Sequence, residues 1–143
     1  MPIPDAEDPI LNKVKKWLAF ADEDLQYARH GLAIQNNPPY RLIAYHAQQC
    51  VEKHLKAYLV FHKCDFPYSH NISNLLDICS RFATWTEQIR DAEELTPFAI
   101  TTRYPGEDDD VSLEEASKAI QIAERVRQVV KQGLTDEGLG KAV

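Results

Sequence analysis

The sequence lacks the features that mark several large classes of protein. It has three cysteines, an odd number with no Cys-x-x-Cys pair, so it predicts neither a disulfide framework nor a structural zinc site. Its uninterrupted apolar runs are far shorter than the ~20 residues that a membrane-spanning helix needs. Residues 1–9 are rich in proline and acid, without the basic region and apolar run of a signal peptide. We therefore expect a cytoplasmic protein with no membrane segment.

Positive charge is also scarce. The chain of 143 residues has 16 Lys and Arg against 22 Asp and Glu, which gives a net charge of −6. Proteins that coat nucleic acid without specificity instead cluster many lysines and arginines against the phosphates. The charge balance therefore excludes general coating of nucleic acid, although it leaves room for one local basic site.

Apolar residues recur at three- and four-residue steps through most of the chain, which is the spacing of amphipathic helices. The spacing predicts long helices over residues 10–33 and 40–63, and a third that begins near residue 71 with Phe82 on its inner face. It also predicts a shorter helix over 86–100. A capping box, Ser112 with Glu115, begins a last helix that we expect to end at Gly133, with Leu113 facing inward.

No stretch alternates apolar and polar residues between turn signals, so strands are not predicted. The expected fold is all-α, an up-and-down antiparallel bundle of four long helices plus a shorter one. The bundle occupies residues 10–133, with flexible termini at 1–9 and 134–143 and an acidic loop at 101–110.

Several motifs of metal and phosphate chemistry are missing. The sequence has no Glu-x-x-His pair, no His-Glu-x-x-His helix, no Gly-x-x-x-x-Gly-Lys loop and no Gly-x-Ser-x-Gly elbow. His46, His54 and His62 are spaced eight residues apart, but each step turns a helix by about 80°, so they cannot form one ligand set. We expect neither a metal nor another cofactor.

The helix over 40–63 has a line of polar residues that a core does not explain. The line follows steps of three, four and three residues, and consists of His46, Gln49, Lys53 and Lys56, with Glu52 beside it. From Arg41 to Lys63 the net charge is +3, which leaves −9 for the rest of the chain. Such a line is suited to hold a phosphate or a carboxylate, to form a subunit interface, or simply to face solvent.

Two other polar positions are open to two interpretations each. His70, directly before the third helix, either bonds to the backbone at that helix N-terminus or joins a polar site. In the loop 101–110, Arg103 and Tyr104 supply a phosphate donor and a stacking ring, or Arg103 pairs with one of the acids that follow.

Three stretches together resemble the HEPN family, the higher eukaryote and prokaryote nucleotide-binding domain. They are YHAQQCVEKHLKAYL at 45–59, PYSHNISNLL at 67–76 and TRYP at 102–105, and the similarity spans 13–132. The resemblance implies a helical homodimer, often encoded beside a small nucleotidyltransferase with which it forms a two-component, toxin–antitoxin-like module. Matching polar positions are His46, Gln49, Glu52, Lys53, Lys56, His70, Arg103 and Tyr104.

Many members of that family resemble metal-independent RNases with an Arg-x4-6-His motif, which Arg41 and His46 fit. In this interpretation His46 transfers the proton of a ribose 2′-OH or of the leaving 5′-oxygen, and Arg41 or Arg103 holds the phosphate. Five residues turn a helix by about 140°, so Arg41 and His46 converge only if the helix begins late or a second subunit contributes. The alternatives are a nucleotide- or RNA-binding partner of a nucleotidyltransferase, an endoribonuclease toxin, and a non-catalytic dimerisation or scaffold module.

Overall fold

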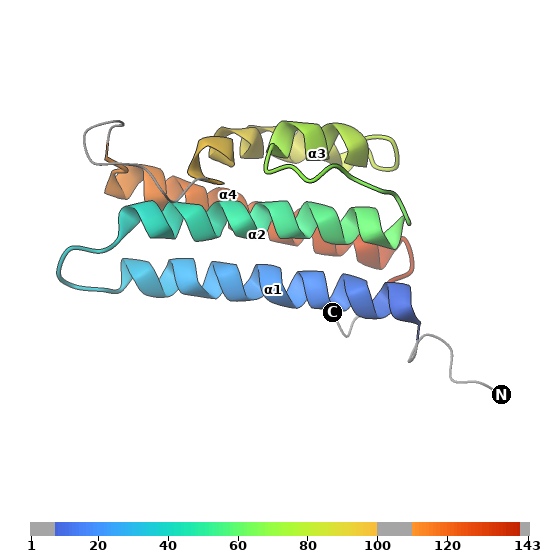
Figure 1. Cartoon of the computed structure of the whole chain (residues 1–143), viewed down its shortest axis with the longest axis horizontal. Helices are drawn as coiled ribbons and strands as arrows, with labels where there is room; N and C mark the ends of the chain where they lie inside the picture. Colours follow the sequence, from blue (N-terminus) through green and yellow to red (C-terminus); the bar gives the residue numbers. More distant parts are fainter. Residues whose placement is uncertain (1–7, 100–109, 141–143) are drawn as a thin grey trace.

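A computed structural model describes residues 8–99 and 110–140 and confirms the all-α fold (Figure 1). The elements are α1 (Pro9–Leu32), α2 (Tyr40–Phe61), α3 (Ile72–Cys79), the 3-10 segment η1 (Trp85–Ala99) and α4 (Leu113–Asp136). No strand occurs in the described ranges. The loop residues 101–109, and with them Arg103 and Tyr104, lie outside these ranges.

Helix α2 is the centre of the bundle. It contacts α1, α3, η1 and α4, and Figure 1 shows α1 on one side of it and α3 with η1 on the other. Most of its residues are consequently buried, including polar ones such as Gln48, Glu52 and His54. Because buried polar groups destabilise a protein unless they are paired, this position requires partners for the polar side of α2.

Local sequence signals explain where the helices begin. Asp8 caps α1 by accepting a hydrogen bond from the Ile10 amide at 2.8 Å, and Pro9 occupies the first turn, where no amide donor is needed. The predicted capping box of α4 is confirmed, since the Ser112 hydroxyl and the Glu115 carboxylate each accept from the other residue's amide at 3.1 Å. These caps satisfy donors that the helix itself leaves unpaired.

The short elements differ from the expectation in detail. Helix α3 ends at Cys79, so Phe82 lies beyond it and is 41% exposed rather than on an inner face. The segment predicted as a shorter helix forms η1 instead, with a kink at Ile89 and Pro97 inside. Both 3-10 and α geometry bring residues three apart to one side, so the apolar spacing alone did not distinguish them.

The end of α4 also differs. The helix continues past Gly133 to Asp136, and Leu134 and Leu139 are buried, although the sequence predicted a flexible terminus from residue 134. Gly133 is needed for close packing and not as a helix stop: a Cβ there would lie 2.5 Å from Nε1 of Trp85. Leu113, expected to face inward, is 47% exposed in the first turn.

The turn after α2 has an unusual backbone. Lys63 has φ 54°, in the left-handed region, and the turn is closed by the Cys64 amide donating to the Leu59 carbonyl at 2.9 Å. Helices commonly end with a residue in the left-handed conformation. That residue is usually glycine, because a side chain raises the energy of this conformation by roughly 1 kcal/mol. In the described ranges, Asn37 is the other non-glycine residue with positive φ.

A polar cluster around the buried His54 joins α2 to α1 and α4. His54 is fully buried; its Nδ1 lies 2.8 Å from the Cys50 carbonyl oxygen and its Nε2 lies 3.8 Å from Oδ1 of Asp22. Burial lowers the pKa of His54 to about 4 from the usual 6.5. Asp22 accepts hydrogen bonds from Arg127 and Lys131; partial burial opposes the change, but these cations lower the pKa of its carboxyl.

None of the described helices combines the length and the apolar character needed to cross a membrane.

We expect His54 to make folding stability dependent on pH. The folded protein keeps His54 neutral down to about pH 4, whereas the unfolded chain binds a proton below pH 6.5, so stability falls as the pH decreases between these values. Across this window the expected loss is about 3 kcal/mol in the free energy of unfolding. Urea denaturation of the wild type and of His54→Leu at several pH values measures it. Parallel pH curves for the two proteins would contradict a buried neutral histidine.

Candidate functional site

Asp24 of α1 connects two members of the predicted polar line on α2. The Asp24 side chain is only 11% exposed. Its Oδ1 lies 2.8 Å from Nδ1 of His46, and its Oδ2 accepts from the Lys53 ammonium at 2.5 Å. An ionised carboxylate can only accept hydrogen bonds, so Nδ1 of His46 carries the proton. In the neutral ring, Nε2 is therefore the nitrogen with a lone pair.

The surroundings of His46 hold its ring in place without covering it. The Tyr27 ring stacks on the imidazole with centroids 5.4 Å apart and planes 19° apart, and Tyr45 meets it edge-on at 5.2 Å. The His46 side chain nevertheless keeps 30% of its surface exposed. An imidazole fixed through Nδ1 by a carboxylate, with solvent access, is suited to transfer protons through Nε2.

Glu52 organises a second polar network next to the first. Its buried carboxylate accepts from Nζ of Lys56 at 3.2 Å, pairs with Nδ1 of His70 at 2.8 Å and accepts from Nε2 of Gln48 at 3.1 Å. The amide of Gln49 donates to Oε1 of Gln48 at 2.7 Å. His70 thus joins a polar site through its side chain, which is one of the two interpretations that the sequence left open.

These contacts pair both lysines of α2 with acids of the same chain. Lys53 is paired with Asp24, and Lys56 with Glu52. A lysine whose charge is already neutralised has less attraction for a phosphate than an unpaired one. The two lysines of the polar line therefore form internal ion pairs, and the oriented imidazole of His46 is the group that stays accessible for chemistry.

Sequence reasoning missed Asp24 and Gln48. Asp24 directly precedes Leu25 of the apolar stripe of α1, and an acid bordering an apolar stripe is a signal that could have indicated a buried partner. Gln48 stood in the quoted motif without a role, yet it is fully buried and links Glu52 to Gln49.

The remaining predicted residues are Arg41 in α2 and two residues of the loop before α4. Arg41 is exposed in the first turn of α2, five residues before His46, so the two side chains leave the helix about 140° apart. Arg103 and Tyr104 are not in the part of the chain that the structure describes. Within that part, no group of three or more His, Cys, Asp and Glu side chains is arranged to hold a metal ion.

Comparisons of the sequence and of the fold with known proteins both find HEPN proteins. The sequence model of the HEPN domain matches residues 14–133. The fold is similar to the crystal structure of ST0689, an archaeal HEPN homologue, with a TM-score of 0.67 and 26% identity, covering 85% of this chain and 97% of that one. It is also similar to TT1696 from Thermus thermophilus, with a TM-score of 0.68, 24% identity, and 85% and 98% coverage, a likeness of fold alone. No match was found among curated proteins.

We expect Asp24→Asn to release His46 and to weaken the junction of α1 and α2. The change leaves Lys53 half-buried without its carboxylate, which costs about 1–3 kcal/mol in the free energy of unfolding. Asparagine has one acceptor oxygen where aspartate has two, and the Lys53 ammonium needs it, so the amide NH2 then faces Nδ1 of His46. Nitrogen NMR of the imidazole should therefore show a larger Nε2–H population.

Glu23→Gln, at a position one residue away that lies outside the two networks, is the matched control and should leave both quantities unchanged. If Asp24→Asn leaves stability and the His46 tautomer as in the wild type, Asp24 does not orient the ring.

Proposed function

This chain belongs to the HEPN domain family, and we propose that it binds a nucleotide or an RNA phosphate beside His46 and acts with a separately encoded nucleotidyltransferase in a two-component, toxin–antitoxin-like module. The observation that carries the proposal is the pairing of His46 with Asp24 at 2.8 Å on a ring that stays partly exposed. Such a ring accepts a ribose hydroxyl proton through Nε2 or, when protonated, donates to a phosphate oxygen.

Arg41 is the proposed phosphate-binding cation. It is exposed on the first turn of α2, and its planar guanidinium offers several donors to phosphate oxygens at once. Lys53 and Lys56 hold Asp24 and Glu52 in position in this proposal and do not bind the phosphate themselves, because these acids already neutralise them. We also propose Arg103 and Tyr104 as ligand contacts, because they belong to the TRYP stretch at 102–105 that resembles the family.

A homodimer would complete the site. Phe20 and Tyr27 are one heptad apart on α1 and are 46% and 69% exposed, and Leu42 at the start of α2 is 39% exposed. Tyr27 stacks on His46, so this apolar surface adjoins the site. We propose that a second copy covers it and brings its own Arg41 toward His46, which overcomes the 140° separation within one chain.

A metal-independent endoribonuclease is the second candidate, favoured by the same Asp24–His46 contact. In that reaction Nε2 of His46 removes the proton of a ribose 2′-OH, and the 2′-oxygen bonds to the adjacent phosphorus as the bond to the 5′-oxygen breaks. The 5′-oxygen takes a proton from solvent, and the imidazolium returns its own to solvent. The product strands end in a 2′,3′-cyclic phosphate and a 5′-hydroxyl. A positioned histidine contributes about 10²- to 10⁴-fold to such a rate. A dimerisation module without a ligand is the third candidate.

One experiment separates these functions. Purified protein is mixed with a labelled single-stranded RNA in EDTA, and binding and cleavage are followed together by fluorescence anisotropy and by gel. We expect binding that weakens roughly tenfold in His46→Ala and in Arg41→Ala, because each variant loses a charge-assisted hydrogen bond. Cleavage that stops in His46→Ala would establish the endoribonuclease instead.

The matched control is Arg81→Ala, at an exposed position just after α3, which should behave as the wild type. Thermal melts of every variant show whether it folds. A folded wild type that neither binds nor cleaves RNA would rule out both ligand-based functions and leave the dimerisation module.

The partnership has its own test. We expect a neighbouring gene to encode a small nucleotidyltransferase whose product co-purifies with this chain after co-expression. This chain lacks the Gly-Ser and paired-Asp pattern of such transferases, so any nucleotidyl transfer by the complex should stop when the partner's catalytic acids are replaced. Separate elution of the two purified proteins on gel filtration would refute the module.

A further inference from the structure

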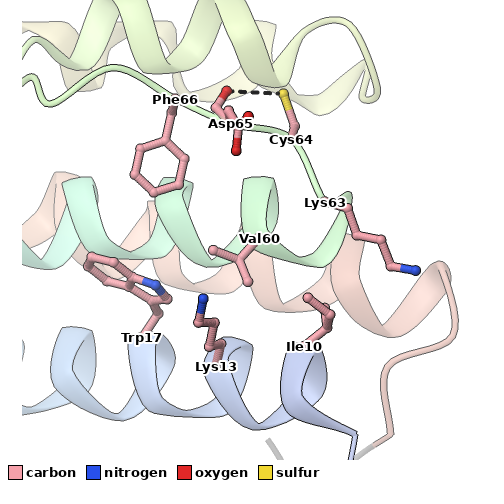
Figure 2. Close-up of a pocket in the computed structure, with 8 residues that line it drawn as sticks. All are labelled: Ile10, Lys13, Trp17, Val60, Lys63, Cys64, Asp65 and Phe66. Carbon is pink, nitrogen blue, oxygen red and sulfur yellow. Dashed lines mark hydrogen bonds between the residues drawn. The ribbon is translucent and has the colours of Figure 1, made fainter.

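A groove opens beside the start of α1 and the end of α2, away from His46. Its volume is about 470 Å³, and its walls are the first turns of α1, the last residues of α2 and the segment that follows α2 (Figure 2). Val60, which lines it, is fourteen residues from His46, or about 20 Å along α2. The groove is therefore separate from the site of the proposed function.

The groove is elongated along α1. Ile10, Lys13 and Trp17 line it at steps of three and four residues, so they lie on one side of the helix over about 10 Å of its length. Figure 2 shows Trp17 and Phe66 at one end of the lining residues and Lys63 at the other. An extended protein segment spans about 3.3 Å per residue, so a groove of this length fits roughly three residues of one.

The lining includes four apolar side chains that are only partly buried: Ile10, Trp17, Val60 and Phe66. The Trp17 and Phe66 rings meet edge to face, with centroids 6.4 Å apart. The Lys56 ammonium lies 5.8 Å from the first ring and 5.6 Å from the second, which joins this end of the groove to the Glu52 network. Apolar surface that is gathered in one hollow and open to solvent is typical of an interaction site. The hollow suits one large apolar side chain of a partner.

The lysines around this groove have no acid of the chain beside them. Residues 9–21 contain three lysines and no acid. None of these forms an ion pair among the described residues, and neither does Lys63. The lysines elsewhere in the described ranges are all paired with an acid: Lys53, Lys56, Lys118 and Lys131. The unpaired lysines of the described ranges therefore all lie at this end of the α1–α2 pair.

The two cations that line the groove point in different directions. Figure 2 shows the Lys13 ammonium turned up between α1 and the Phe66 segment, and the Lys63 ammonium extended outward at the far end. Asp65 adds a carboxylate to the lining. Cations placed in this way do not converge on one phosphate, and the carboxylate would repel it. They suit acids on the two sides of an apolar residue in a peptide, whose backbone N–H groups a carboxylate can accept from.

We propose that this groove docks an extended segment of another protein, in which one large apolar side chain lies between acidic residues. The apolar side chain covers the hollow between Trp17 and Val60, and the acids on its two sides pair with Lys13 and Lys63. Asp65 accepts from a backbone amide of the segment. The proposal goes beyond the function proposed above, because none of the residues that line the groove is paired with Asp24 or His46.

The two tryptophans give an internal readout by NMR. The indole N–H of Trp17 reports on the groove, whereas that of Trp85 faces Gly133 of α4 and serves as the reference. Full-length protein is titrated with three synthetic heptapeptides. SEDFDES has phenylalanine between acids, SKRFRKS has it between bases, and SEDGDES has the acids alone.

We expect SEDFDES to shift the Trp17 signal alone and to bind roughly tenfold more tightly than either of the other peptides. The net charge of −6 repels acidic peptides from the chain as a whole, so this preference requires a local basic surface. The affinity should fall as the salt concentration rises, because salt screens exposed charges.

Lys13→Glu and Lys15→Glu are a matched pair of variants. Both lysines are exposed and unpaired, and both substitutions change the net charge equally, but the two residues lie on opposite sides of α1. We expect Lys13→Glu to weaken binding of SEDFDES roughly tenfold and to strengthen binding of SKRFRKS, whereas Lys15→Glu should stay near the wild type for both.

Lys63→Gly tests the other end of the groove without loss of stability. Its φ of 54° favours glycine, so the variant should melt no lower than the wild type and yet bind SEDFDES roughly tenfold more weakly. Asn37→Gly relieves the same backbone conformation away from the groove, and should leave binding unchanged.

The proposal is overturned if SEDFDES at millimolar concentration leaves the Trp17 signal in place, if it binds no better than the other two peptides, or if Lys13→Glu and Lys15→Glu bind it equally. Tighter binding of penta-adenylate RNA than of SEDFDES at Trp17 would assign the groove to nucleic acid instead. A change of oligomeric state in Lys13→Glu would assign it to a second copy of this chain. His46→Ala should keep full peptide binding, so failure of this groove and failure of the His46 site are distinguishable.

Discussion

The hydrogen bonds that Asp24 accepts from His46 and Lys53 are the contacts on which the arrangement of the polar side of α2 depends. Helix α2 is packed by every other element, so its cations cannot all reach solvent. An unpaired charge in such a position would be costly, whereas a carboxylate supplied by α1 satisfies two donors together. Glu52 does the same for Lys56 and His70. With both acids in place, α2 can be central to the core and still carry polar chemistry along one side.

This neutralisation also divides the molecule into two chemical regions. Where Asp24 meets His46 and Lys53, the charges are paired and an oriented imidazole stays accessible, which can transfer a proton or, when protonated, donate to a phosphate oxygen. Beyond the other end of α2, Lys63 has no ion-pair partner among the described residues and lines the same cavity as Trp17 and Phe66. Lys56 belongs to both regions, since it pairs with Glu52 and lies against the two rings.

Much of the fold follows from patterns that are local in the chain. The 3.6-residue spacing located α1, α2 and α4, and the Ser112 capping box marked the start of α4 within one turn. The incorrect predictions concern helix ends, which depend on contacts with residues far apart in the sequence. Glycine commonly ends a helix, but Gly133 lies inside α4, where the absence of a side chain makes room for Trp85. Phe82 lies outside α3 because that helix ends at Cys79, and the spacing of apolar residues does not indicate where a helix ends.

The sequence by itself determined the all-α class and the shared side of α2 on which His46, Lys53 and Lys56 lie, because both depend on spacing along one helix. Only the tertiary structure decided which partner each of these side chains has. Asp24 is 22 residues from His46, and Trp17 of α1 meets Phe66 from the segment beyond α2. Such pairs form when helices dock, and charge or aromaticity at one position does not specify the residue that will face it. The same polar line could have bound a phosphate directly; the packing of α1 against α2 made it a set of internal ion pairs with one imidazole left accessible.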